Sequence, residues 1–161
     1  NTKTPTGLIF SRQDIKDLPA ATESRYDEAQ GARHGGYVVM DTPHPQVVLV
    51  GNGSEVSLLC DVAVQLEAGQ VPCRVVSVPS LGLFEDQDAD YRNSVIPTNG
   101  TPVFGLTAGL PSTLRSVVGP HGKVFGLDHF GASAPFKVLD REFGFTVENI
   151  TEEVLRFLGR I

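Results

Sequence analysis

The stretch QVVLVGNGSEVSLLCDVAVQLEAGQVPCRVVSVPS, residues 46–80, decides the fold class. It opens and closes with short apolar runs that are typical of buried strands. Between them, apolar residues recur at helical spacing, with Ser54 placed to cap the helix and Gly69 placed to end it. Glu55 lies in the first turn, where a negative charge is favourable. An apolar strand, an amphipathic helix and a second apolar strand predict part of an open, mostly parallel sheet.

The same alternation continues on both sides of this stretch. Besides the strands at 46–51 and 72–80, further strands are predicted at 36–41, 101–107 and 122–128. Helical segments are predicted at 80–96, 110–119 (closed by Gly119), about 135–143 (begun by Pro135 and ended by Gly144) and from Thr146 onward. The last helix is expected to bury Val147, Ile150, Val154, Phe157 or Leu158, and Ile161. The sequence therefore predicts a three-layer α/β fold, with a mostly parallel sheet of about five strands and helices on both faces.

The N-terminal part of the chain does not follow this alternation. TGLIFSR, residues 6–12, is a short apolar run with a polar exit and is expected to be a buried strand. Residues 13–36 are polar and without a sustained period, which is typical of a linker with a helical turn. We therefore expect residues 1–35 to be the end of another domain and a linker, and residues 36–161 to be the main domain.

Composition excludes several classes of function. The chain has 161 residues with 13 basic and 19 acidic side chains, and its formal net charge of -6 argues against nucleic-acid binding. No apolar run approaches the roughly 20 residues of a membrane span. Cys60 falls on an apolar helical face and Cys73 opens an apolar strand. Two buried, reduced thiols in a cytosolic protein are expected, although the sequence leaves a disulfide between them open.

The first candidate site is the turn GNGSEV, in which Gly51 and Gly53 precede a helix N-terminus that offers free N–H groups. A phosphate could bind there. The complete dinucleotide fingerprint is missing, because Val56 stands where its third glycine belongs and no acidic residue ends the next strand. A structural turn is the expectation, and an anion- or nucleotide-binding module is the alternative.

The second candidate is the group Asp128, His129 and Ser133. Adjacent residues at the end of a strand point to opposite faces, so Asp128 is poorly placed to orient His129 as in a catalytic triad. Ser133 lacks the G-x-S-x-G nucleophile turn and is expected to cap a turn or helix. We therefore assign no catalytic residue.

An acidic stretch and a single arginine are the remaining charged candidates. The acidic stretch FEDQDADYR, residues 84–92, lacks the glycine and final glutamate of a calcium loop and is expected to cap helices. Arg12 ends the predicted strand at 6–12, at the kind of position where open α/β sheets bind ligands. A lone arginine there is usually solvated or ion-paired, so the residues alone leave both roles open.

Five stretches, in order along the chain, resemble the C-terminal part of the transketolase family. Together they cover nearly the whole chain, and the GSEVS turn, the F-x-x-Q…Y-R-x-S-V-x-P block and the FGASAP turn are specific as a set. The matching stretches are PTGLIFSRQDI (5–15), GGYVVMD (35–41), VVLVGNGSEVSLLCDVAVQL (47–66), CRVVSVPSLGLFEDQDADYRNSVIP (73–97) and VFGLDHFGASAPFKVLDREFGFTVENI (124–150).

The resemblance implies an enzyme that uses thiamine diphosphate and Mg²⁺ to move a two-carbon ketol unit from a ketose phosphate to an aldose phosphate in the pentose phosphate pathway. It also implies a cytoplasmic homodimer that binds the cofactor between a pyrophosphate-binding domain of one subunit and a pyrimidine-binding domain of the other. The C-terminal domain lies outside that site. The isolated chain is thus expected to be inactive, to bind no cofactor, and to have a structural or dimer-interface role.

One functional residue is carried over from the resemblance. Arg12 matches the arginine of the S-R-Q motif that contacts the substrate phosphate, in a segment that resembles the last strand of the pyrimidine-binding domain. Two positions depart from the family pattern: His129 replaces the usual arginine and Thr107 the usual glutamate. A related thiamine diphosphate enzyme such as dihydroxyacetone synthase remains an alternative.

Overall fold

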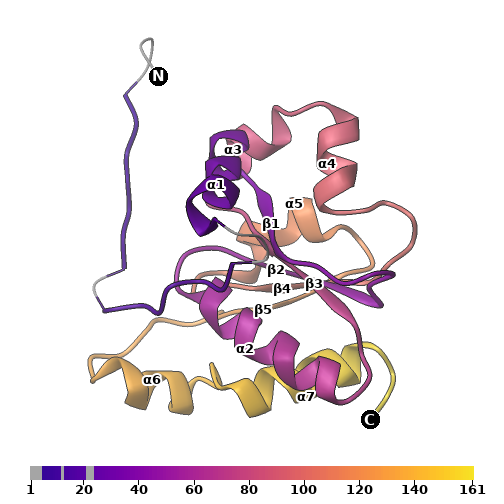
Figure 1. The fold of residues 1–161 in the computed structure, drawn as a ribbon. Coiled ribbons are helices and arrows are strands. Elements are labelled where there is room, and N and C mark those ends of the chain that lie inside the picture. The colour runs from indigo at the N-terminus through magenta and orange to yellow at the C-terminus, as the bar shows by residue number, and fades with distance from the viewer. Residues whose placement is uncertain (1–4, 12, 21–23) are drawn as a thin grey trace.

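A five-stranded sheet forms the centre of the computed structural model, which describes residues 5–11, 13–20 and 24–161 (Figure 1). Its strand order is β1-β3-β2-β4-β5. β1 pairs antiparallel with β3, and the other three pairings are parallel. The predicted α/β fold with a mostly parallel sheet is confirmed. The strands are β1 (Tyr37–Met40), β2 (Val47–Gly51), β3 (Cys73–Ser77), β4 (Val103–Leu106) and β5 (Lys123–Phe125).

Helices cover both faces of the sheet. No helix in the described part of the chain is long and apolar enough to cross a bilayer. The longest are α2 and α7, which pack against each other on one face. The helices are α1 (Arg25–Ala29), η1 (Gln30–His34), α2 (Glu55–Ala68), α3 (Leu81–Glu85), α4 (Ala89–Val95), η2 (Pro111–Leu114), α5 (Arg115–Val118), α6 (Phe136–Glu142) and α7 (Val147–Phe157).

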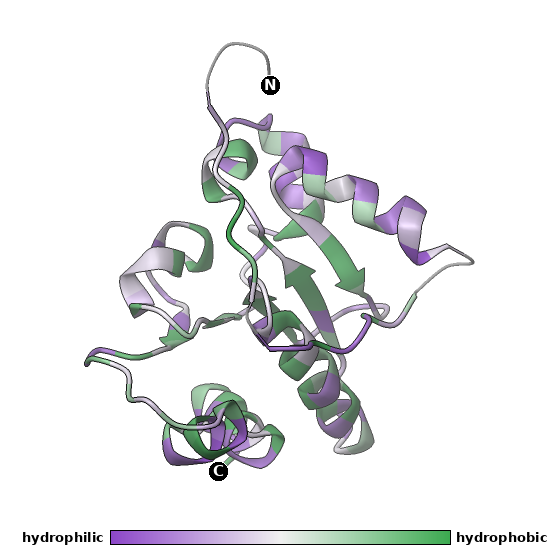
Figure 2. Cartoon of the chain, turned by 90° about the vertical axis from the view of Figure 1, so that its left-hand side faces the viewer, coloured by the Kyte–Doolittle hydropathy of each residue, from purple (hydrophilic) through white to green (hydrophobic). Residues whose placement is uncertain are grey.

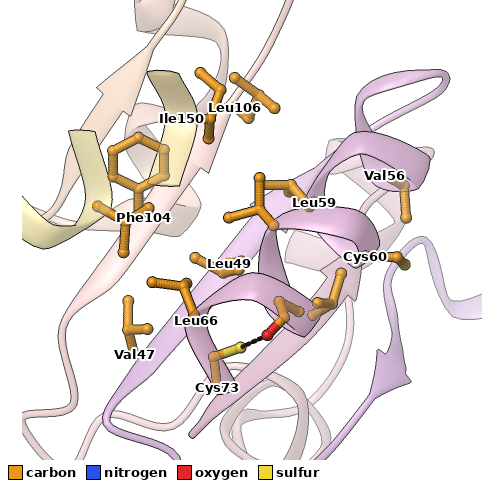
Figure 3. Close-up of a cluster of buried hydrophobic side chains, with 14 of the residues drawn as sticks. Val47, Leu49, Val56, Leu59, Cys60, Leu66, Cys73, Phe104, Leu106 and Ile150 are labelled. Carbon is orange, nitrogen blue, oxygen red and sulfur yellow. Dashed lines mark hydrogen bonds between the residues drawn. The ribbon is translucent and has the colours of Figure 1, made fainter. Parts of the chain in front are cut away.

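Two hydrophobic cores hold the layers together, because successive residues of a strand point to opposite faces. In β2, Val47 and Leu49 join the core under α2 and α7, whereas Val48 and Val50 join the core under α3, α4 and α5. Figure 3 shows the first core, in which Leu49 lies among side chains of α2 and Phe104 of β4 lies beside α7. Figure 2 shows the hydrophobic residues concentrated in the strands, with mixed surfaces on the helices.

The predicted helix ends are largely confirmed. Gly69 ends α2, and the Thr146 side chain caps α7 by accepting a hydrogen bond from the Asn149 N–H at 3.3 Å. Gly144 directly follows Phe143, the C-cap residue of α6. Its φ is 80°, a left-handed conformation that glycine adopts without steric cost. One expectation for α7 is wrong: Ile161 is 66% exposed, because the helix ends at Phe157 and the chain then leaves the core.

The predicted buried strand at 6–12 is also wrong for the residues that the structure describes. Residues 5–11 form no strand and run as an extended segment away from the sheet (Figure 1). Ile9 is 99% exposed and Phe10 is 82% exposed. A strand needs a neighbouring strand for its backbone hydrogen bonds, and the described part of the chain places none beside this segment. Arg12 lies outside the described residues.

Both cysteines are free thiols, as predicted. Burial is the main cause that raises the pKa of Cys60 to about 11 and that of Cys73 to about 12. Because the thiolate is the reactive form, both side chains are inert at neutral pH and act as small apolar groups. The Cys73 thiol lies 3.9 Å from the Ala63 carbonyl oxygen, a contact drawn in Figure 3.

Candidate functional site

The strand order changes direction between β2 and β4. From β2 the chain passes through α2 to β3 on one side, whereas β4 and β5 lie on the other side of β2. In open α/β sheets, ligands bind in the crevice outside the carboxyl ends of the strands at such a point. Here this edge is formed by the turn Gly51–Glu55 after β2 and by Thr107 and Ala108 after β4.

The carboxylate of Glu55 lies at this edge, at the N-terminus of α2. The Ser54 hydroxyl donates a hydrogen bond to Oε1 of Glu55 at 2.7 Å. The prediction that the Ser54 side chain caps the backbone of α2 is therefore wrong. Burial raises the pKa of Glu55, and the charge of Asp140 raises it further. Hydrogen bonds from Ser54 and from the backbone of Ala108 and of Glu55 itself act in the opposite direction. The chain's own carboxylate therefore occupies the place where the sequence had suggested a bound phosphate.

The glycines of the turn have structural roles. Gly53 has φ +59°, a left-handed conformation that other residues adopt only at a cost. A Cβ at Gly51 would lie 2.9 Å from Cδ1 of Leu59, which is too close for an unstrained contact. Together with the engaged Glu55, this geometry favours the structural interpretation of the turn over the anion-binding alternative.

A cleft of about 670 Å³ opens beside Glu55. One wall is the N-terminal half of α2, the opposite wall is α6, and residues 13–16 of the N-terminal segment lie along it. Asp140 on α6 faces the same cleft, and burial raises its pKa. The large apolar side chains that line the cleft are Ile15, Leu58, Leu127, Phe136, Leu139, Phe143 and Phe145.

Asp128, His129 and Ser133 all lie in the exposed loop between β5 and α6. Since β5 ends at Phe125, the expectation that Asp128 and His129 alternate at a strand end is wrong. The His129 ring packs edge-on against Phe143 with ring centroids 5.3 Å apart, and no described hydrogen bond joins the three side chains. Their proximity in the sequence creates no catalytic arrangement.

Two other polar candidates also have local structural roles. Asp88 caps α4 by accepting a hydrogen bond from the Tyr91 N–H at 2.7 Å, which confirms the capping prediction for the acidic stretch. Thr107 is buried, and its Oγ1 accepts a hydrogen bond from the Gly109 N–H at 3.1 Å, which shapes the turn after β4. Within the described ranges, no group of three or more His, Cys, Asp or Glu residues could hold a metal ion.

The sequence does not reveal the cleft or that Glu55 and Asp140 both face it. It draws attention to Glu55 only for its place near a helix N-terminus, and nothing in it marks Asp140. The two residues are 85 positions apart in the chain, and nothing in the local pattern around either one signals the other. Only the packing of α6 near α2 brings them to one cleft.

Comparison with known proteins identifies the family. The model of the transketolase-like C-terminal domain matches residues 35–146. The chain is 41% identical to transketolase 2 of Vibrio parahaemolyticus over 156 residues, which is 96% of this chain but 23% of that relative. It superposes on the transketolase of Leishmania mexicana with a TM-score of 0.80 and 36% identity, over 92% of this chain and 21% of that one.

A second solved structure agrees with the first. It is a transketolase variant of Pichia stipitis in complex with xylulose-5-phosphate, matched with a TM-score of 0.79 and 27% identity over 92% of this chain and 20% of that one. The chain thus spans about a quarter of the length of the curated relatives it matches. It belongs to the transketolase-like C-terminal domain family.

Proposed function

We propose that this chain is the C-terminal domain of a transketolase that transfers a two-carbon ketol unit from a ketose phosphate to an aldose phosphate. The observation that carries the proposal is the match of 96% of the chain to proteins named transketolase, of which it covers 23%. The Pichia stipitis structure in complex with xylulose-5-phosphate supports sugar phosphates as the substrate class. A cytoplasmic homodimer is part of the same proposal.

We divide the chain at residue 35. Residues 1–35 are proposed to be the end of the pyrimidine-binding domain and the linker, and residues 36–161 the C-terminal domain. Two observations support this division. The family match begins at residue 35. The apolar side chains of Leu8, Ile9 and Phe10 are exposed, as expected for a strand whose partner strands belong to another domain.

Thiamine diphosphate and Mg²⁺ are proposed as cofactors of the longer enzyme. The described residues of this chain do not fit them: the Glu55 carboxylate, bonded by Ser54 and the backbone of Ala108, lies at the start of α2, and the described residues form no metal-binding cluster. The proposal therefore places ketol transfer outside residues 36–161. In this proposal the domain contributes a rigid, two-core body that positions the segment carrying Arg12 and adds to the subunit interface.

Ketol transfer by the longer protein is the test of the proposal. With thiamine diphosphate and Mg²⁺, it should convert xylulose 5-phosphate and ribose 5-phosphate, whereas the 161-residue chain alone should show no activity. A longer protein that is folded but inactive on this pair would refute the assignment. Activity only with an acceptor aldehyde that lacks a phosphate would favour a dihydroxyacetone synthase instead.

Arg12 is the residue proposed to contact the substrate phosphate. A planar guanidinium suits phosphate, and losing a hydrogen bond to a charged group costs about 1.5–3 kcal/mol. Arg12→Ala in the longer protein should therefore lower kcat/KM for phosphorylated sugars about 10- to 100-fold, mainly through KM. Unphosphorylated substrates provide the control, because their kcat/KM should be unchanged. An equal loss with both substrate types would show that Arg12 has only a structural role.

A further inference from the structure

The cleft between α2 and α6 has the size and position of a ligand site. Its volume of about 670 Å³ lies within the range of about 300–1,000 Å³ that is typical of small-molecule pockets. It lies at the carboxyl edge of the sheet, where the direction of the strand order changes. Ser54 and Glu55 follow β2, and Ala108 follows β4, so the segments at the switch point themselves line the cleft.

The walls of the cleft are apolar and aromatic, yet they are not covered by the domain itself. None of the seven residues of α6 is buried, and Phe136 is 43% exposed. Phe143 also lines the cleft from the end of α6, and Leu58 lines it from α2. Aromatic walls of this kind favour a flat apolar body, and aromatic faces also attract organic cations.

The charges inside the cleft are mainly negative and poorly compensated. Glu55 and Asp140 face it from α2 and α6, and Asp14 and Asp61 also line it. In the described part of the chain, no hydrogen bond or ion pair engages the Asp140 side chain. Lys16 is already paired with Asp61 at 3.0 Å, and Lys137 forms no ion pair with a described residue.

The hydrogen-bonding groups decide which charge a ligand should carry. Hydrogen bonds from the Ser54 hydroxyl and from the backbone of Ala108 and Glu55 already serve the Glu55 carboxylate, so an anion would have to compete with it and would meet the carboxyl groups of the cleft. An organic cation would meet carboxyl acceptors from both walls and the aromatic side chains that line the same cleft.

We propose that the cleft between α2 and α6 is a binding site for a small organic cation, in which an amidinium or ammonium group on a flat apolar body is held by Glu55 and Asp140. This site is independent of ketol transfer, since it uses no sugar-phosphate contact. It depends on the geometry of the residues that line the cleft, which lie in the ranges 13–16, 54–61, 108, 127 and 131–145.

Benzamidine and its neutral analogue benzamide are suitable probes, because they have nearly the same shape and differ in charge. Binding is followed by the backbone amide signals of Ala108 and Asp140 in the isotope-labelled 161-residue chain at neutral pH and constant ionic strength. Benzamidine should shift these signals with a Kd on the order of 1 mM, as expected for a ligand of this size. Benzamide should bind at least about tenfold more weakly, because it lacks the charge.

Two variants and one control test the assignment of residues. Asp140→Asn and Glu55→Gln preserve shape and hydrogen-bonding oxygens but remove charge, and each should weaken benzamidine binding about tenfold. Asp128→Asn, in the exposed loop outside the cleft, should leave the affinity unchanged within about twofold. Circular dichroism of each variant checks that the fold is preserved.

Several results would overturn the proposal. These are equal affinities for benzamidine and benzamide, no shift of the cleft signals at about 10 mM probe, or unchanged binding in both variants. The titration is then repeated on the longer protein, where the same affinity is expected. Loss of binding there would show that another domain covers the cleft and would also overturn a small-molecule site. Failure of ketol transfer would not bear on any of these results.

Discussion

The central strands β2 and β4 and the peripheral helix α6 are held in place by different interactions. Every residue of β2 and of β4 is buried, whereas α6 has no buried residue. The centre is specified by the packing of apolar side chains, which tolerates little change of volume. Helix α6 buries no residue, and in the described part of the chain no ion pair joins it to another element. The ring of Phe143, its C-cap residue, contacts the His129 ring. We infer from this comparison that β2 and β4 contribute most to the free energy of unfolding, whereas residues of α6 are available for ligand binding at little cost in stability.

The largest expected difference between the two regions concerns phenylalanine side chains. Phe104 in β4 is 0% exposed and lies beside Ile150 in the first core (Figure 3), whereas Phe136 in α6 is 43% exposed. Phe104→Ala should lower the free energy of unfolding by about 3–5 kcal/mol, because it leaves a cavity. Phe136→Ala should cost less than about 1 kcal/mol. Urea unfolding measures both, and similar losses would contradict the comparison.

The next largest difference concerns glycines. Gly53 has φ +59° and open space around it, so Gly53→Val should cost about 1–3 kcal/mol through backbone strain alone. Gly131 in the edge loop has open space and no positive φ, so Gly131→Val should change the free energy of unfolding by less than about 0.5 kcal/mol. Chemical denaturation tests the pair. A larger loss at Gly131 would show that the edge loop is more constrained than its geometry indicates.

Two glutamates should give pH dependences of opposite sign. Burial raises the folded-state pKa of Glu55 above 4.5, so its ionisation destabilises the fold progressively as pH rises through and above that value. The Lys123 side chain, 2.6 Å from the carboxylate, is the main cause that lowers the pKa of Glu153 below 4.5. Glu153 therefore stabilises the fold above pH 4.5, and this contribution is lost as pH falls through its lowered pKa.

Matched glutamine variants isolate these two contributions. Relative to the unchanged protein, Glu55→Gln should become more stable as pH rises from 4 to 7, and Glu153→Gln should become less stable over the same range, in effects of about 1 kcal/mol or less. Denaturant midpoints at several pH values provide the measurement. No change with pH in the stability difference between Glu55→Gln and the unchanged protein would mean that the cleft carboxyl is as well solvated as an ordinary surface group.

The smallest expected effect is at His129. This side chain is exposed and contacts the Phe143 ring, and the family resemblance of the sequence implies an arginine at this position. His129→Arg should change the free energy of unfolding by less than about 0.5 kcal/mol, because a long arginine can cover the same ring. A shift of the melting temperature beyond about 2–4 °C would show that this position contributes more to packing than the edge location suggests.

Most of the fold could be predicted because its signals are local. The apolar run of β2 and the helical spacing of α2 each reflect which face of one element meets the core. The antiparallel direction of β1 could not be predicted in this way. Tyr37 pairs with Ser77, and this pairing is set by the position and direction in which the preceding segment enters the sheet. The residues of β1 do not encode that direction.

The failures of prediction share one physical cause. The segment Thr6–Ser11 has the composition of a strand, but a strand exists only where another strand supplies hydrogen bonds. Asp128 and His129 are neighbours in sequence, but β5 ends before them and leaves them in a loop. In both cases the local sequence favours a strand, but the surrounding structure provides no strand pairing for those residues.

The sequence by itself determined the α/β layering, the central strands and the family, because periodicity and burial follow from the residues of each element. Only the tertiary structure decided that the two thiols are unpaired, that Glu55 is engaged by Ser54 and Ala108 at the turn after β2, and that Asp140 faces the same cleft. Such a site depends on distances between elements that are far apart in the chain, and those distances are set by the packing of whole helices against the sheet.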